Sequence, residues 1–131
     1  MMKTYVGRRA DAPDPARELG ALVTVNGRPL PPRIDLWNHS PSGFEWGYAG
    51  SGPAQLALAI LADYLGASVK GSQSADLALS LHQPFKFEVV CKLPHEGWTL
   101  TSQDVEKFMA TSPTAIALRQ EGRASSATSA S

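Results

Sequence analysis

The sequence has little of several features that would assign it to a class of protein. It has one cysteine, Cys91, in 131 residues, which excludes a disulfide framework and a zinc site of several cysteines. Basic and acidic residues number 12 each, so no net charge draws the molecule toward nucleic acid or a membrane. No apolar run approaches the ~18 residues of a spanning helix, and no signal-peptide core follows the first residues. We therefore expect a cytoplasmic protein without membrane contact.

What is present is an ordinary hydrophobic content of 43%, enough for one buried core in a chain of this length. We predict one globular α+β domain over residues 1–118. Residues 119–131 show no apolar periodicity and are predicted to be a disordered tail. Cys91 lies at the end of an apolar run and is predicted to be a buried structural thiol.

The N-terminal part of the chain is typical of short strands. Residues 4–7 and 21–25 are predicted strands, the second because it is rich in β-branched residues. The dipeptide at 26–27, Asn-Gly, favours a type I′ turn and predicts a hairpin that returns through residues 28–30. A further short strand is predicted over residues 34–37.

The clearest helix is predicted over residues 53–65. Proline at its first position suits a helix start, Ser51 or Gly52 is the expected N-cap, and Gly66 ends it. The helix is apolar over most of its circumference, so we expect it at the centre of the domain. Four residues form the narrow strip that is predicted to face water: Gln55, Ala59, Ala62 and Asp63.

The C-terminal part predicts two short helices and a strand. Residues 75–82 favour a short helix over a strand, and residues 85–93 alternate apolar and polar side chains as a half-buried strand does. Residues 101–104 have the spacing of a capping box for a helix over 102–110. The fold is thus predicted to be a small antiparallel sheet packed on a central buried helix, with one or two further short helices.

The loop from 38 to 52 carries the candidate functional residues. Its aromatic residues Phe44, Trp46 and Tyr48 alternate, so in an extended segment they would share one face. Gly50, Ser51 and Gly52 lead into the helix, whose free N–H groups could hold a phosphate or a carboxylate. We favour a tight entry into a core helix over this anion site, because the turn has no Walker pattern.

Polar residues of the same loop have structural and catalytic interpretations. His39 and Ser40 could be a base and a nucleophile, but we favour a structural role in which His39 and Asn38 form hydrogen bonds to irregular loop backbone. Glu45 is expected to be solvated, or to pair with Arg9 or Arg33, rather than to act as a general acid. The three histidines His39, His82 and His95 match no compact metal-binding spacing even with nearby Glu45 or Glu96, so we expect no metal and no other cofactor.

The central run resembles a family of small bacterial proteins classed only as a domain of unknown function. The run extends from His39 through Gly43-Phe44-Glu45-Trp46-Gly47-Tyr48 and Gly50-Ser51-Gly52-Pro53-Ala54-Gln55 to Ala59. Flanking pieces at residues 5–9, 85–86 and 97–101 are similar to that family too. The resemblance implies an origin among phage, plasmid or integrated-element genes, and it implies no activity, cofactor or catalytic residue.

Three functions follow as hypotheses. The first is a non-enzymatic accessory protein of a bacterial mobile element that binds an unknown protein partner. The second is a small anion- or nucleotide-binding or hydrolytic domain that uses the turn at 50–53. The third is a binder of single-stranded nucleic acid, in which aromatic side chains stack on bases and arginines contact phosphates. The residues expected to contact a partner are His39, Ser40, Phe44, Glu45, Trp46 and Tyr48.

Overall fold

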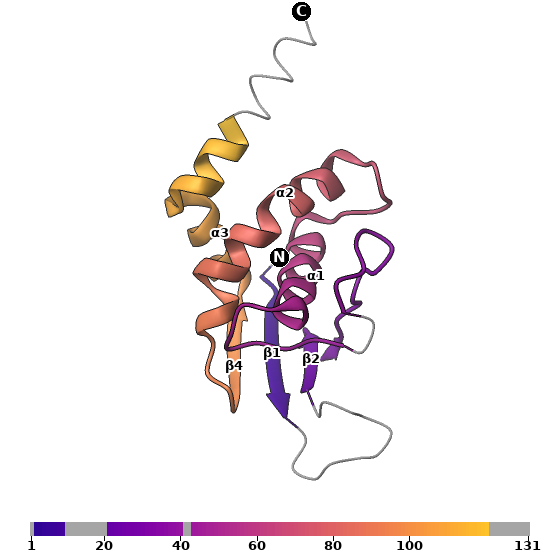
Figure 1. The fold of residues 1–131 in the computed structure, drawn as a ribbon, viewed down its shortest axis with the longest axis vertical. Coiled ribbons are helices and arrows are strands. Elements are labelled where there is room, and N and C mark those ends of the chain that lie inside the picture. Colours follow the sequence, from indigo (N-terminus) through magenta and orange to yellow (C-terminus); the bar gives the residue numbers. More distant parts are fainter. Residues whose placement is uncertain (1, 10–20, 41–42, 121–131) are drawn as a thin grey trace, which may run out of the picture.

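The computed structural model describes residues 2–9, 21–40 and 43–120. They form a four-stranded antiparallel sheet and a set of helices (Figure 1), which confirms the predicted α+β class. The strands, in the sheet order β3-β2-β1-β4, are β1 (Thr4–Arg9), β2 (Ala21–Val25), β3 (Arg28–Pro29) and β4 (Gly97–Thr101). The helices are α1 (Ser51–Leu65), α2 (Gln73–Glu88), the short 3-10 helix η1 (Val90–Lys92) and α3 (Ser102–Thr111).

The predicted hairpin is confirmed. Strands β1 and β2 pair antiparallel, and β2 turns into the two-residue edge strand β3. Asn26 and Gly27 both have positive φ, 49° and 81°, as a type I′ turn requires. Strand β4, for which the sequence indicated no strand, pairs with β1 on its other side. This pairing brings residues nearly a hundred positions apart into register.

One face of the sheet carries the core. Alternate residues along β1, Tyr5 and Gly7, are buried, and so are Trp98 and Leu100 opposite them on β4. Packing leaves no room for a side chain at Gly7, because a Cβ there would lie 2.3 Å from the Trp98 indole. The indole of Trp98 therefore packs directly on the backbone of β1.

Helix α1 is the centre of the molecule, as predicted, and it is buried more completely than predicted. Every residue from Gly52 to Ala62 is buried, so the expected water-facing strip is wrong for Gln55, Ala59 and Ala62, and only Asp63 is partly exposed. The sheet, α2 and the loop before α1 together surround the helix (Figure 1). Gly66 ends α1 with φ 68°, as expected, whereas the N-cap is Gly50 and not Ser51 or Gly52.

The largest error concerns residues 85–93, which were predicted to be a strand. Helix α2 runs through Pro84 to Glu88, and η1 follows. The residues that α2 buries recur at helical spacing, and Phe87, which the strand pattern placed inward with Phe85, is exposed. The carbonyl that loses its helical donor to Pro84 belongs to Ser80, which lies on the exposed side of the helix. Packing along α1 thus outweighs the local alternation and the proline.

Two smaller predictions have opposite outcomes. The strand predicted over residues 34–37 is wrong, because residues 34–36 form a turn in which the Leu36 N–H donates to the Arg33 carbonyl at 3.0 Å. The capping box is confirmed, since the Thr101 hydroxyl accepts from the Asp104 N–H and the Asp104 carboxylate accepts from the Thr101 N–H.

The chain is helical again over residues 113–120. Of the tail predicted from residue 119, the first two positions are therefore helical, and 121–131 lie outside the described residues. No described helix combines the length and apolar character needed to cross a bilayer.

Candidate functional site

The loop before α1 is tied to the helix by one buried side chain, Gln55. Its Oε1 accepts from the N–H groups of His39 and Ser40 at 2.7 and 3.1 Å. Its Nε2 donates to the carbonyls of Pro32 and Trp37 at 2.6 and 3.0 Å. Both amide lone pairs and both amide hydrogens are therefore used. The sequence feature that indicates this role is a single amide side chain in an apolar helix. It lies next to a loop whose irregular backbone cannot supply all of its own hydrogen-bond partners.

A second anchor is the ion pair of Arg9 and Glu45. The guanidinium meets the carboxylate in a bidentate contact, with N–O distances of 2.8 and 3.1 Å. Arg9 also lies 4.5 Å from the centroid of Trp46, and both side chains donate to the carbonyl of His95. Pairing of Glu45 with Arg9 was one of the two structural interpretations of the sequence, and it is the one observed.

A hollow of about 480 Å³ lies beside this anchor at the N-terminus of α1. Gly52 has no room for a side chain, because a Cβ would lie 2.7 Å from the Cβ of Glu45. Most of the predicted site residues line the hollow, and so does His95, which was not among them. Its lining residues are Ser40, Glu45, Trp46, Gly47, Tyr48, Ser51, Gly52, Leu93 and His95.

The chemistry of the hollow is limited. Within the described residues no side chain caps α1 and no acidic residue lies in its first turn, which leaves N–H groups there for an anion. The carboxylate of Glu45 lines the same hollow and opposes that anion. The Ser40 hydroxyl donates to the Gly43 carbonyl at 2.8 Å, and the described residues join it by no hydrogen bond to a histidine. Among the described residues, Ser40 is therefore not paired with a histidine that could activate it.

The three aromatic residues of the loop do not share one environment. Phe44 and Trp46 are buried, whereas Tyr48 is exposed. Gly47, between them, has φ 86° and breaks the extended alternation on which the prediction depended. The face expected to present three rings to a partner presents Tyr48 alone.

His39 takes part in a different contact. Its Nε2 lies 2.9 Å from Nε2 of His82 on α2. The Nδ1 of His82 lies 2.6 Å from the carbonyl of Leu79, so Nδ1 carries the hydrogen and Nε2 of a neutral His82 is the acceptor. The Nε2–H of His39 therefore donates to His82. Trp37 stacks on His39 with ring centroids 5.4 Å apart and planes 18° apart.

Lys86, one turn further along α2, completes this cluster. Only 8% of Lys86 is exposed to solvent, and its ammonium lies 4.2 Å from the centroid of the Phe87 ring. Burial lowers the pKa of His39 and of His82, and the charge of Lys86 lowers both further. Both effects favour the neutral form of the two rings. We call His39, His82 and Lys86, flanked by Trp37 and Phe87, the imidazole cluster.

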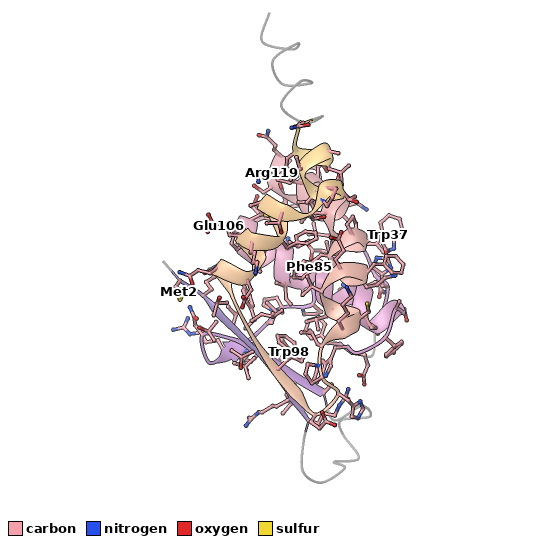
Figure 2. The ribbon with its side chains drawn as sticks, turned by 90° about the vertical axis from the view of Figure 1, so that its left-hand side faces the viewer. Met2, Trp37, Phe85, Trp98, Glu106 and Arg119 are labelled. Atoms are coloured by element: carbon pink, nitrogen blue, oxygen red, sulfur yellow. The ribbon has the colours of Figure 1, made fainter. Side chains whose placement is uncertain are left out.

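The two aromatic side chains of the imidazole cluster stand out from the surface. Trp37 is 57% and Phe87 55% exposed, and Figure 2 shows Trp37 at the margin of the molecule while Phe85 and Trp98 lie within it. The sequence indicated His39 as a site residue. It gave no such indication for Lys86 and Phe87, since the predicted strand placed both wrongly.

Arg33 and Cys91 form their contacts within the fold. Arg33 contacts Asp35 and donates to the carbonyls of Ala67 and Ser68. Cys91 is half-buried rather than buried, and its thiol donates to the Phe87 carbonyl at 3.0 Å. In the part of the chain that the structure describes, no three metal-ligating side chains come together.

The fold and these two neighbouring sites define a small α+β domain whose central helix carries an anchored loop. Over residues 5–111 the chain matches a family of unknown function, DUF6166, and it belongs to that family. This confirms the domain-of-unknown-function resemblance. The comparisons returned no match among curated proteins and none among solved structures.

Proposed function

We propose that this domain is a non-enzymatic accessory protein that binds a partner protein through the imidazole cluster. The observation that supports this function is the exposure of Trp37 and Phe87 beside neighbours that are held in place. Large aromatic side chains on a rigid base are the typical anchors of protein interfaces. The further proposal that it serves a bacterial mobile element depends on the resemblance of the 39–59 run.

Capture of a partner tests the proposal. Tagged protein should retain a specific protein from the lysate of its host, and the purified partner should bind again in isothermal titration. Trp37→Ala and Phe87→Ala should each weaken that binding by at least about tenfold, as for an interface anchor. The matched control is Val69→Ala, which removes another exposed apolar side chain, 66% exposed, from a different loop. Equal affinities of all four proteins would refute the proposal.

The hollow at the start of α1 supports a second candidate, the binding of a small anion or nucleotide. Its support is the set of uncapped N–H groups beside an open volume. Inorganic phosphate or a nucleotide should then raise the melting temperature, and Glu45→Gln should strengthen the effect because it removes the opposing charge. A melting temperature that responds to neither ligand in either protein removes this candidate.

Binding of single-stranded nucleic acid has less support. Of the aromatic residues considered for stacking, Phe44, Trp46 and Trp98 are buried. Arg9 and Arg33 are engaged within the fold. Trp37 and Tyr48 remain exposed as a small platform for stacking. Of the arginines Arg8, Arg9, Arg28 and Arg33, the first and the third are exposed.

A further inference from the structure

We propose that the imidazole cluster is a carboxylate-binding site, and that it receives an acidic side chain of the partner protein next to an apolar one. The inference depends on the proposed function and adds the chemistry of recognition. It has three supports: the state of Lys86, the hydrogen bond between the two histidines, and the aromatic rings on either side.

Lys86 holds a charge that the fold does not neutralise. More than nine-tenths of the residue is buried, but its Nζ is not among the buried polar atoms left without a partner, so the stem is buried while the ammonium reaches the surface. The ion pairs of the described residues use other cations, namely Lys3, Arg9 and Arg33. The Lys86 ammonium lies over the Phe87 ring, 4.2 Å from its centroid. An arriving carboxylate would gain a charge-assisted hydrogen bond without breaking an existing ion pair.

The two histidines can add to this attraction. Their shared hydrogen bond occupies both Nε2 atoms, and His82 Nδ1 is occupied by Leu79. The position left for a further proton is therefore Nδ1 of His39, where it would add a second positive charge and a second donor. In addition to burial, the charge of Lys86 lowers the pKa of His39. The pKa of His82 is lowered by burial and by the charges of His39 and of Lys86. A bound carboxylate offsets the Lys86 charge, so binding should take up a proton and strengthen as the pH falls from 8 to 6.

The surroundings favour a carboxylate of a protein over a phosphate of a nucleic acid. Phe87, next to Lys86, and Trp37, stacked on His39, offer exposed apolar contact area in the cluster. A nucleic acid draws its affinity from many cations together, whereas this chain has equal numbers of acidic and basic residues. A single acidic residue beside a hydrophobic one matches the charge and the shape of the cluster.

Nuclear magnetic resonance of the imidazole side chains tests the site directly. The probe is N-acetyl-phenylalanyl-aspartyl amide, and its neutral match is the asparaginyl peptide. The acidic peptide should shift the signals of His39 and His82 in a saturable manner and raise their pKa values, and the neutral peptide should do so at least about tenfold more weakly. Lys86→Met keeps the apolar stem and should lose the preference for the acidic peptide, while Lys107→Met, at an exposed position of α3, should retain it.

Several results would overturn the inference. Equal responses to the two peptides, no response to the acidic peptide, or a preference that survives in Lys86→Met would each do so. A response to inorganic phosphate or to a short oligothymidylate without one to the acidic peptide would assign the cluster to phosphate instead. The measurement on the unaltered protein stands even if Lys86→Met does not fold.

The proposed function has a separate outcome. If Trp37→Ala weakens binding of the purified partner while Lys86→Met leaves it unchanged, partner binding stands and the carboxylate site falls. If both variants weaken it and only the acidic peptide shifts the histidines, both proposals are supported. If Trp37→Ala, Phe87→Ala and Lys86→Met all leave it unchanged, both fall.

Discussion

The loop that precedes α1 has two sides with different chemistry. On one side the carboxylate of Glu45 meets Arg9 in a bidentate pair, and Trp46 donates to the His95 carbonyl. On the other side Lys86 has no carboxylate among the described residues, and Trp37 projects from the surface. Both sides hold aromatic residues next to a cation, yet one is complete within the fold and the other is not.

Because of this difference, we expect the anchored side to contribute mainly to stability and the cluster side to recognition. Burying a charge costs free energy unless a partner compensates for it, and Arg9 with Glu45 meets that condition. The imidazole cluster contains a cation that has no ion-pair partner among the described residues, together with two exposed aromatic rings. A large loss of stability is therefore expected from changes to the anchored side, and a loss of binding from changes to the cluster.

The largest effect on stability should come from Gln55→Ala. It leaves two carbonyls and two N–H groups without their partner, and it should lower the free energy of unfolding by about 3 kcal/mol. Chemical denaturation measures the change. Gln103→Ala, at an exposed position of α3, is the control and should change it by less than about 0.5 kcal/mol. Similar values for the two variants would mean that Gln55 does not anchor the loop.

A smaller loss should follow Arg9→Met, which keeps an apolar stem near Trp46 and leaves Glu45 unpaired. We expect about 2 kcal/mol less free energy of unfolding, because a charge that is mostly buried loses its partner. Arg8→Met is a matched control, since Arg8 is the next residue of β1 and is exposed. If denaturation midpoints of the two variants coincide, the pair contributes no stability.

Acid should lower the stability of the fold through the histidines of the cluster. The pKa of His82 is lower in the folded protein than its ordinary value, so between these two values the unfolded chain binds more protons. Stability is therefore full above the ordinary histidine value near 6.5 and declines as the pH falls below it. His82→Gln should reduce the decline in melting temperature between pH 7 and 5.5, and His95→Gln, at an exposed position, should not. An unchanged decline in His82→Gln would contradict the neutral histidine pair.

The smallest effect on stability is expected from Trp37→Ala. More than half of this side chain is exposed and its ring packs on His39, so the free energy of unfolding should change by less than about 1 kcal/mol. Thermal and chemical denaturation check this alongside the partner titration. A loss comparable to that of Gln55→Ala would place Trp37 among the structural residues and weaken the contrast between the two sides.

Local signals in the sequence predicted much of the fold. The Asn-Gly turn, the glycine after α1 and the capping box of α3 each depend on a few neighbouring residues, and each is confirmed. The strand predicted over 85–93 failed because contact of α2 with α1 outweighs the local alternation of apolar and polar residues. Such a choice depends on residues some thirty positions away.

The candidate sites were predictable only in part. The sequence offered pairing of Glu45 with Arg9 or Arg33 as one of its alternatives, for the case in which the carboxylate points inward and needs a cation. The contact of His39 with His82 had no local signal, since the two residues are far apart in the chain and meet only after α2 packs on α1. Gln55 was assigned to water because helical periodicity alone does not show what surrounds a polar position.

The sequence by itself determined the α+β class, the hairpin, the buried central helix and the place of the loop before it, because turns, caps and apolar periodicity act over short range. Only the tertiary structure decided that α2 continues through Pro84, that Gln55 holds the loop, and that His39, His82 and Lys86 meet. These outcomes depend on burial and on hydrogen-bond partners supplied by distant segments. Long-range packing therefore created the cluster on which the proposed function depends.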